Sequence, residues 1–273
     1  MSKNIMPKLQ RDRIVEYITS GKRFDGRELN EFRDIVVEKA ISKNAESAIS
    51  LKLGNTHVYA GVKMAVTTPY PDSPAEGTFM TTAELHPMAS NNFDIGRPGI
   101  EAIELARVID RGIRESGFID FGKLCIKEGE KVWQVFVDII AINDDGNLFD
   151  AAGLAALIAL GQARLPVYNE ETEKIEHEFT KDPLPLNKEA LSFNTTFHKI
   201  GNQIVIDPSV EEQRVSDYRL SVAIGEGNKK CRITAMQKGK EGAINTEEME
   251  KILNLVEEVY SKKYSEVKSL VFD

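Results

Sequence analysis

The sequence predicts an α+β fold built from two lobes, each made of a β-sheet and helices. Three observations predict it: short segments alternate apolar and polar residues with period two, longer segments with helical periodicity follow them, and this order repeats in the second half. With 273 residues the chain can bury a core without disulfides or a structural metal. Its 41% hydrophobic and 29% charged residues are typical of a globular protein and exclude a disordered one.

The first half of the chain opens with a helix and a series of strands. Residues 6–20 predict a short helix, with a proline near its start and a glycine after its end. Alternation then predicts strands at residues 35–37, 49–53, 58–64 and 78–88. Gly54-Asn55 is a hairpin turn between two of these strands, whereas residues 69–77 are a loop by composition.

Two helices and a buried strand complete this half. Residues 98–117 form an amphipathic helix pattern. Residues 133–143 are apolar at nearly every position, which predicts a central strand covered on both faces. Residues 151–163 are apolar all round and predict a helix inside the core. Three prolines between residues 165 and 188 predict a surface excursion and a lobe boundary.

The second half repeats the pattern on a smaller scale. Strand patterns lie at residues 192–207 around a turn at Gly201-Asn202, and at 218–226 and 230–237 on either side of a turn at Gly227-Asn228. An apolar stripe that runs from Met249 to Tyr260 then predicts a final helix. Asn245 or Thr246 is its expected cap.

Charge and cysteine usage narrow the class of protein. A net charge of −8 argues against nucleic-acid binding over the whole surface but leaves room for a local basic patch. No apolar run reaches the length of a membrane span, and the first residues lack the apolar segment of a signal peptide. Cys125 and Cys231 stand far apart in apolar runs and predict buried free thiols. We therefore expect a cytoplasmic protein that does not bind membranes.

Patterns typical of metal or nucleophile chemistry are weak. No phosphate-binding loop or nucleophile elbow occurs, and no metal-ligand spacing links the histidines, which are His57, His86, His177 and His198. Asp144, Asp145 and Asp150 together would suit Mg²⁺. The spacing favours the alternative, in which Asp-Asp-Gly is a turn and Asp150 caps the next helix. We expect no metal site, no cofactor and no catalytic residue.

One predicted helix carries a row of arginines. Arg107, Arg111 and Arg114 fall within about 60° of arc opposite the apolar face, over a length of about 10 Å. Guanidiniums in such a row suit successive phosphates of a nucleic-acid strand. The alternative is a solvated surface in which Glu104 pairs with Arg107 and Asp110 pairs with Arg114. The spacing alone favours the paired surface.

Four segments together resemble the ribonuclease PH family. They are RFDGRELNEFR (23–33), LGNTHVYAGVK (53–63), VFVDIIAINDDGNLFDAAGLAAL (135–157) and DPSVEEQRVSD (207–217). Within the family, ELARVIDRGIRES and DGNLFDAAGLAAL are most similar to the noncatalytic type of ring subunit in the archaeal exosome. The resemblance implies a helical extension over residues 1–22, a larger N-terminal lobe over 23–188 and a smaller C-terminal lobe over 189–273.

The resemblance also implies partners. It implies a hexameric ring, a trimer of heterodimers in which this chain alternates with a catalytic paralogue, together with RNA-binding cap proteins. Active relatives degrade single-stranded RNA from the 3′ end with inorganic phosphate as the attacking group. In archaeal exosomes the noncatalytic subunit contributes arginines to the RNA path. Arg107 and Arg111 match those positions best, and Arg114 extends the row.

A departure at the phosphate site implies that this chain lacks the chemistry of its active relatives. Active members hold the phosphate with Gly-Ser/Thr-Arg after the central strand. Here Gly146 is followed by Asn147 and Leu148. Leucine has neither a hydrogen-bond donor nor a charge, so it cannot hold an anion.

A second departure concerns the catalytic carboxylates. Active members place two aspartates six residues apart, for acid catalysis and Mg²⁺, but counted from Asp207 these positions hold Gln213 and Arg219. If the register slips, Glu212 or Asp217 would replace them. The alternative functions are then a self-sufficient phosphate-dependent 3′-to-5′ exoribonuclease, or a purely architectural ring protein whose arginine row is only a salt-bridged surface.

Overall fold

The computed structural model describes residues 6–169, 172, 174–227 and 230–273. The helices are α1 (Lys8–Thr19), α2 (Ile100–Arg114), α3 (Leu148–Gln162), α4 (Val210–Val215) and α5 (Thr246–Phe272), with 3₁₀ turns η1 (Phe121–Leu124) and η2 (Lys188–Ala190). The strands are β1 (Ile35–Lys39), β2 (Ser47–Leu53), β3 (Thr56–Thr67), β4 (Thr78–Leu85), β5 (Cys125–Lys127), β6 (Lys131–Asn143), β7 (Arg164–Asn169), β8 (Lys174–Pro183), β9 (Ser192–Ile200), β10 (Gln203–Ile206), β11 (Tyr218–Glu226) and β12 (Cys231–Gly239). The α+β prediction is confirmed.

The first half of the chain forms the large sheet. Its strand order is β1-β2-β3-β6-β4, and β5 adds to β6. Only β4 and β6 run parallel among the pairs of this sheet that the structure describes. The predicted hairpin turn is confirmed, since Gly54 adopts a left-handed φ of 58° between β2 and β3. The long central strand β6 places Asn143 and the turn after it at one edge of the core.

The second half forms a small antiparallel sheet with the order β10-β9-β11-β12. Its predicted hairpin turn at Gly201-Asn202 is confirmed between β9 and β10. In the other predicted turn, Asn228 lies outside the described residues. Asn245 caps α5 through a capping box with Glu248, as the sequence predicts.

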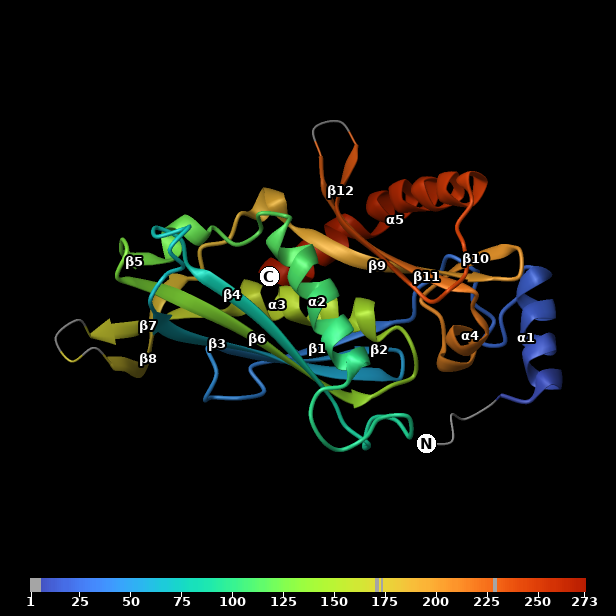
Figure 1. The fold of residues 1–273 in the computed structure, drawn as a ribbon, viewed down its shortest axis with the longest axis horizontal. Coiled ribbons are helices and arrows are strands. Elements are labelled where there is room, and N and C mark those ends of the chain that lie inside the picture. The colour runs from blue at the N-terminus through green and yellow to red at the C-terminus, as the bar shows by residue number, and fades with distance from the viewer. Residues whose placement is uncertain (1–5, 170–171, 173, 228–229) are drawn as a thin grey trace.

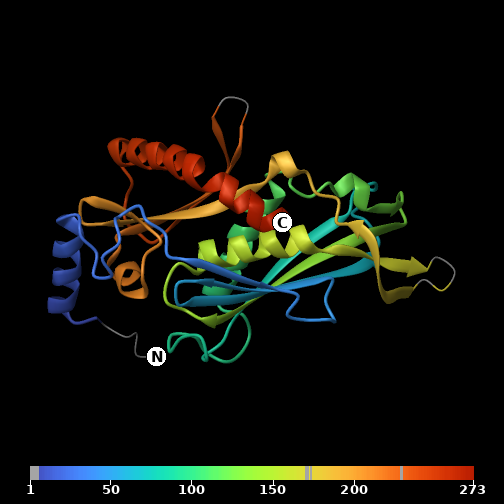
Figure 2. The ribbon, with the colours of Figure 1, turned by 180° about the vertical axis from the view of Figure 1, so that it is seen from behind.

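Helix α3 is the central layer of the molecule. It packs against β2 and β3 of the large sheet on one side and against β9 and α5 on the other (Figures 1 and 2). Its apolar side chains are buried on every side, which confirms the prediction from its composition. Helix α2 lies beside α3 and contacts β4, β9 and β12. These two helices carry the functional side chains described below.

The N-terminal helix packs against the small sheet rather than the large one. Ile14 and Ile18 of α1 form a separate small core with Ile200, Val205 and Val215. In Figure 1, α1 lies beside α4 at the end of the molecule opposite the β7–β8 hairpin. The first residues of the chain are therefore held by the last third of it.

The predicted surface excursion between residues 165 and 188 contains the two-stranded β7–β8 ribbon, which tolerates prolines that a central strand excludes, and the lobe boundary there stays a prediction. Other local expectations are wrong. The cysteines are free but half-buried rather than buried. Helix α3 begins three residues early, and its cap is Asn147, not Asp150. Asp150 lies in the first turn, where buried hydrogen bonds to Thr196 hold it.

Among the described residues, no helix combines the length and the apolarity needed to cross a membrane.

Candidate functional site

A buried network of ions connects the beginning of the chain to the small lobe. Arg23 donates to both carboxylate oxygens of Glu212, at 3.0 and 2.6 Å, and its side chain is fully buried. Arg27 and Arg33 donate to Asp207 at 2.8–2.9 Å. Burial alone would raise the pKa of Asp207, but the hydrogen bonds and charge of Arg33 outweigh it and lower the pKa. Asp207 is therefore ionised and committed to structure.

The same network fixes the turn between β6 and α3. Arg33 donates to the carbonyl oxygens of Asp145 and Gly146, at 2.9 and 3.0 Å. A side chain at Gly146 would overlap the carbonyl oxygen of Pro208, and its φ of 90° also favours glycine. The turn after β6 and the segment that begins at Asp207 therefore lie against each other. The structure brings together both departures identified in the sequence.

The residues that depart from the family pattern are hydrophobic, cationic or neutral polar. Leu148 and Phe149 are buried at the start of α3. The Arg219 guanidinium lies 4.0 Å from the centroid of the Phe149 ring and forms an ion pair with Glu104 of α2. Gln213 lies in α4. A guanidinium repels a divalent cation and a glutamine cannot act as an acid, so these residues do not fit Mg²⁺.

The two substitutes considered for a shifted register are placed differently. Glu212 is buried and bound to Arg23, while it also accepts a hydrogen bond from the backbone of Ser209. Asp217 is exposed, and its backbone N–H donates to Lys199 at 2.8 Å. The pairing of β9 with β11 runs from Tyr218 onward without a shift. Glu212 is therefore engaged in an ion pair, whereas Asp217 stays exposed.

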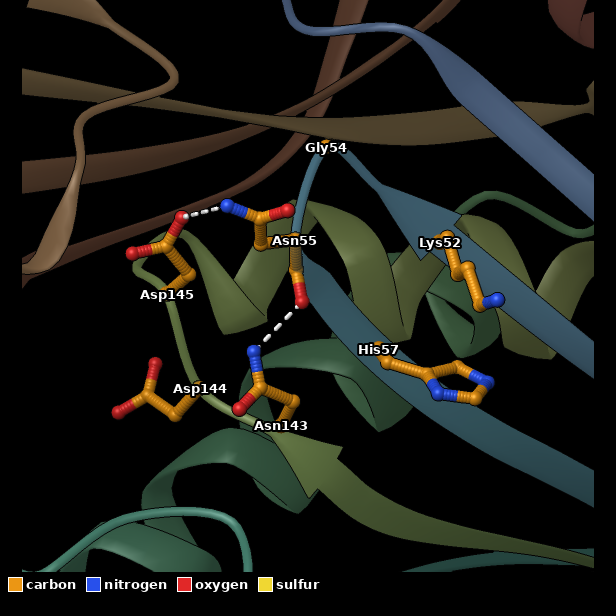
Figure 3. Close-up of a pocket in the computed structure, with 7 residues that line it drawn as sticks. All are labelled: Lys52, Gly54, Asn55, His57, Asn143, Asp144 and Asp145. Carbon is orange, nitrogen blue, oxygen red and sulfur yellow. Dashed lines mark hydrogen bonds between the residues drawn. The ribbon is translucent and has the colours of Figure 1, made fainter.

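The aspartates after β6 line a hollow of about 450 Å³ but do not meet at one point. Figure 3 shows the carboxylates of Asp144 and Asp145 separated from each other, with Asp145 accepting a 3.3 Å hydrogen bond from Asn55. Burial raises the pKa of Asp144. Asp150 points into the core instead. Within the described ranges, no three acidic, histidine or cysteine side chains form a metal-binding group.

The histidines whose side chains are described have structural partners. His57 hydrogen-bonds Ser50 at 2.8 Å, and His86 hydrogen-bonds Glu84 at 3.0 Å. His198 is buried and hydrogen-bonds a serine, and burial holds its pKa well below the ordinary value. The side chain of His177 lies outside the described residues.

The arginine row on α2 is only partly paired. Arg114 binds Asp110 at 2.9 Å, as the spacing predicts, and also donates to the carbonyl oxygen of Phe79 at 2.7 Å. Arg111 pairs with Glu115 at 2.5 Å across an exposed surface. The expected pair between Glu104 and Arg107 is absent, because Glu104 binds Arg219.

Arg107 is therefore the available cation of the row. It is exposed and makes no ion pair or hydrogen bond with any residue that the structure describes. Arg107 and Arg111 line one wall of a groove of about 680 Å³ between α2 and the small sheet. The rest of the lining mixes polar, acidic and apolar side chains, among them Asn194, Ser221, Gln237, Glu104, Glu115, Ile103 and Met236. The two guanidiniums on this wall suit the phosphates of an extended polyanion.

Comparison with known proteins agrees with this architecture. The model of the 3′ exoribonuclease family, domain 1, matches residues 31–166, and the model of domain 2 matches residues 193–258. The chain belongs to the 3′ exoribonuclease, or ribonuclease PH, family. These two matches fall on the large sheet with α2 and α3, and on the small sheet with the start of α5.

Relatives within the 3′ exoribonuclease family are similar over nearly the whole chain. Exosome complex component Rrp42 of Methanothermobacter thermautotrophicus is 44% identical over 93% of both chains. Exosome complex component Rrp42 of Thermococcus kodakarensis is 42% identical over 98% of this chain and 96% of its own. A chain of the Archaeoglobus fulgidus exosome, solved with RNA bound to the active site, is 37% identical over 94% of this chain and 97% of its own, with a TM-score of 0.84.

Sequence reasoning missed the contact between Arg219 and Glu104. The two residues are 115 positions apart, so no local spacing connects them. The arginine itself is the available signal, because a half-buried guanidinium favours a nearby counter-charge.

Proposed function

We propose that this chain is a noncatalytic subunit of an exosome core. In this role it forms a cytoplasmic hexameric ring, a trimer of heterodimers, with a catalytic paralogue, and RNA-binding cap proteins sit on the ring. It structures the paralogue's active site and contributes Arg107, Arg111 and Arg114 to a path for single-stranded RNA. Its near full-length likeness to subunits named exosome complex component Rrp42 supports the assembly.

One observation carries the noncatalytic assignment. By its resemblance to the family pattern, Arg219 replaces a metal-binding aspartate, and its contacts with Phe149 and Glu104 support this assignment. Leu148 independently removes the phosphate-binding arginine from a different segment. Reversing either loss alone would leave the other, so the chain needs a partner for chemistry.

The exposed guanidinium of Arg107 supports RNA contact over a purely architectural role. Arg111 also supports it, because its exposed pair with Glu115 contributes little and a phosphate can displace it. Arg114 is held by Asp110 and contributes positive potential at the end of the row.

The test is phosphate-dependent shortening of a single-stranded RNA oligonucleotide in the presence of Mg²⁺. The purified chain alone should leave the RNA intact, and the mixture with its catalytic paralogue should shorten it. Omitting phosphate from the mixture is the control for contaminating hydrolytic nucleases. Phosphorolysis by the chain alone would overturn the noncatalytic role and favour the self-sufficient enzyme.

A further inference from the structure

Glu104 has two possible cationic partners. It lies three residues before Arg107 on α2, which is a spacing at which helical side chains of opposite charge pair. It also faces Arg219 of β11, and the structure shows the ion pair with Arg219. Arg107 is left without a partner among the residues described. Arg107 is therefore unpaired when Glu104 binds Arg219, and would be paired if Glu104 bound Arg107 instead.

Arg219 is the stronger competitor because it is fixed in place. Its guanidinium packs on the Phe149 ring. It also lies so close to Gly239 of the neighbouring strand that a Cβ atom there would overlap the guanidinium. The Arg219 side chain is 12% exposed, whereas Arg107 is exposed to solvent. An ion pair sheltered from water is stronger than a solvated pair on a helix surface, and a fixed partner loses less side-chain entropy. Glu104 accordingly binds Arg219.

We propose that Arg219 is a positioning residue for RNA binding. By holding the Glu104 carboxylate, it keeps Arg107 unpaired and available to a phosphate of single-stranded RNA. In this proposal, the arginine that replaces a metal-binding aspartate also keeps the arginine row available. This inference rests on the proposed function, in which Arg107 contacts RNA.

The test measures affinity in the ring assembled with the catalytic paralogue, without phosphate or Mg²⁺ so that the RNA is not degraded. The probe is a fluorescein-labelled oligoadenylate. Arg219→Met releases Glu104 onto Arg107 and should weaken binding about threefold. Glu104→Gln alone should bind as tightly as the native chain or more tightly. The double variant should regain native affinity, which a merely structural defect at Arg219 would not do.

Arg107→Ala separates this inference from the proposed function. If Arg107→Ala binds RNA as the native chain does, the proposed RNA contact fails. If Arg107→Ala weakens binding but Arg219→Met does not, or if Glu104→Gln fails to rescue Arg219→Met, only the positioning role is overturned. Arg219→Met added to Arg107→Ala should cause no further loss. If Arg219→Met prevents assembly of the ring, Glu104→Gln alone still tests the positioning role. An RNA affinity of Glu104→Gln below that of the native chain would overturn it.

Discussion

Asp150 is the buried acid that joins the two lobes. It lies at the start of α3 and accepts hydrogen bonds from the backbone and hydroxyl of Thr196 on β9, at 3.0 and 2.7 Å. Asn147 donates to both Asp150 and Asp207 at 2.9 Å. Asp150 is thereby connected to the ion network that Asp207 forms with Arg27 and Arg33. Burial raises the pKa of Asp150 to about 7, against the hydrogen bonds from Thr196 and Asn147.

This raised pKa predicts a pH-dependent stability. Between the ordinary pKa of 3.8 and about 7, the unfolded chain ionises Asp150 while the folded chain keeps it protonated. The folded state binds the extra proton, so its free energy of unfolding falls with rising pH by about 1.4 kcal/mol per pH unit from this group. Below and above that window the contribution is constant.

Urea unfolding of the native chain and of Asp150→Asn at several pH values measures the effect. Other carboxylates titrate equally in both proteins and cancel in the difference. The advantage of the native chain over the variant should shrink steadily from pH 4 to 7 and then level off. A difference that does not change with pH would contradict the assignment.

At the scale of elements, α3 and α5 approach at a glycine. A side chain at Gly161 would overlap the carbonyl oxygen of Val271 near the end of α5. Gln162 donates to the same carbonyl oxygen at 3.1 Å. This approach of α3 to α5 therefore depends on the absence of a Cβ atom at Gly161.

Gly161→Ala should lower the free energy of unfolding by about 2 kcal/mol, because overpacking displaces the end of α5. Helix propensity acts in the opposite direction by roughly 1 kcal/mol, so a loss cannot come from α3 itself. The matched control is Gly122→Ala, where the nearest atom to the new Cβ is 3.6 Å away. Chemical denaturation of both variants checks the prediction, and equal stabilities would refute it.

Features set by near neighbours in the chain could be predicted from the sequence. The turns at Gly54 and Gly201 and the cap at Asn245 depend on residues within a few positions, and all three are confirmed. The absent pair between Glu104 and Arg107 was not predictable, because a distant strand supplies a better cation. The cap at Asp150 was wrong because α3 begins earlier, at Leu148, and the residue that holds Asp150 there, Thr196, is 46 positions away.

The candidate site was likewise predictable in part from the sequence. The two substituted segments were identified from the sequence, and the structure places them against each other. That Arg219 packs on Phe149 is a tertiary contact and was not predictable from spacing. The division at residues 22 and 188 stays a prediction.

At the scale of the whole molecule, an acidic protein carries a local basic wall. The net charge of −8 discourages contact with RNA elsewhere on the surface, while Arg107 and Arg111 attract it to the groove. RNA binding should therefore be confined to one face and depend strongly on salt.

The salt dependence counts the phosphates that these arginines neutralise. Replacing both Arg107 and Arg111 by alanine should reduce the slope of log affinity against log salt by about 1.4, since each single-strand contact contributes about 0.7. Fluorescence anisotropy of the assembled ring at several salt concentrations measures it. Lys123→Ala with Lys127→Ala, two exposed lysines outside the groove, is the matched control. Equal slopes in both variants would place the RNA elsewhere.

The clamp between Arg23 and Glu212 has a consequence for synthesis on the ribosome. Its two residues are 189 positions apart, and at about 5–20 residues per second the second is made roughly 10–40 seconds after the first. Until residues 200–215 are made, Ile14 and Ile18 lack the other buried members of their small core, which are Ile200, Val205 and Val215. The nascent chain thus exposes its first helix while the large sheet is being built. The first helix can be buried, and so become inaccessible to chaperones and proteases, only once the small sheet has been completed.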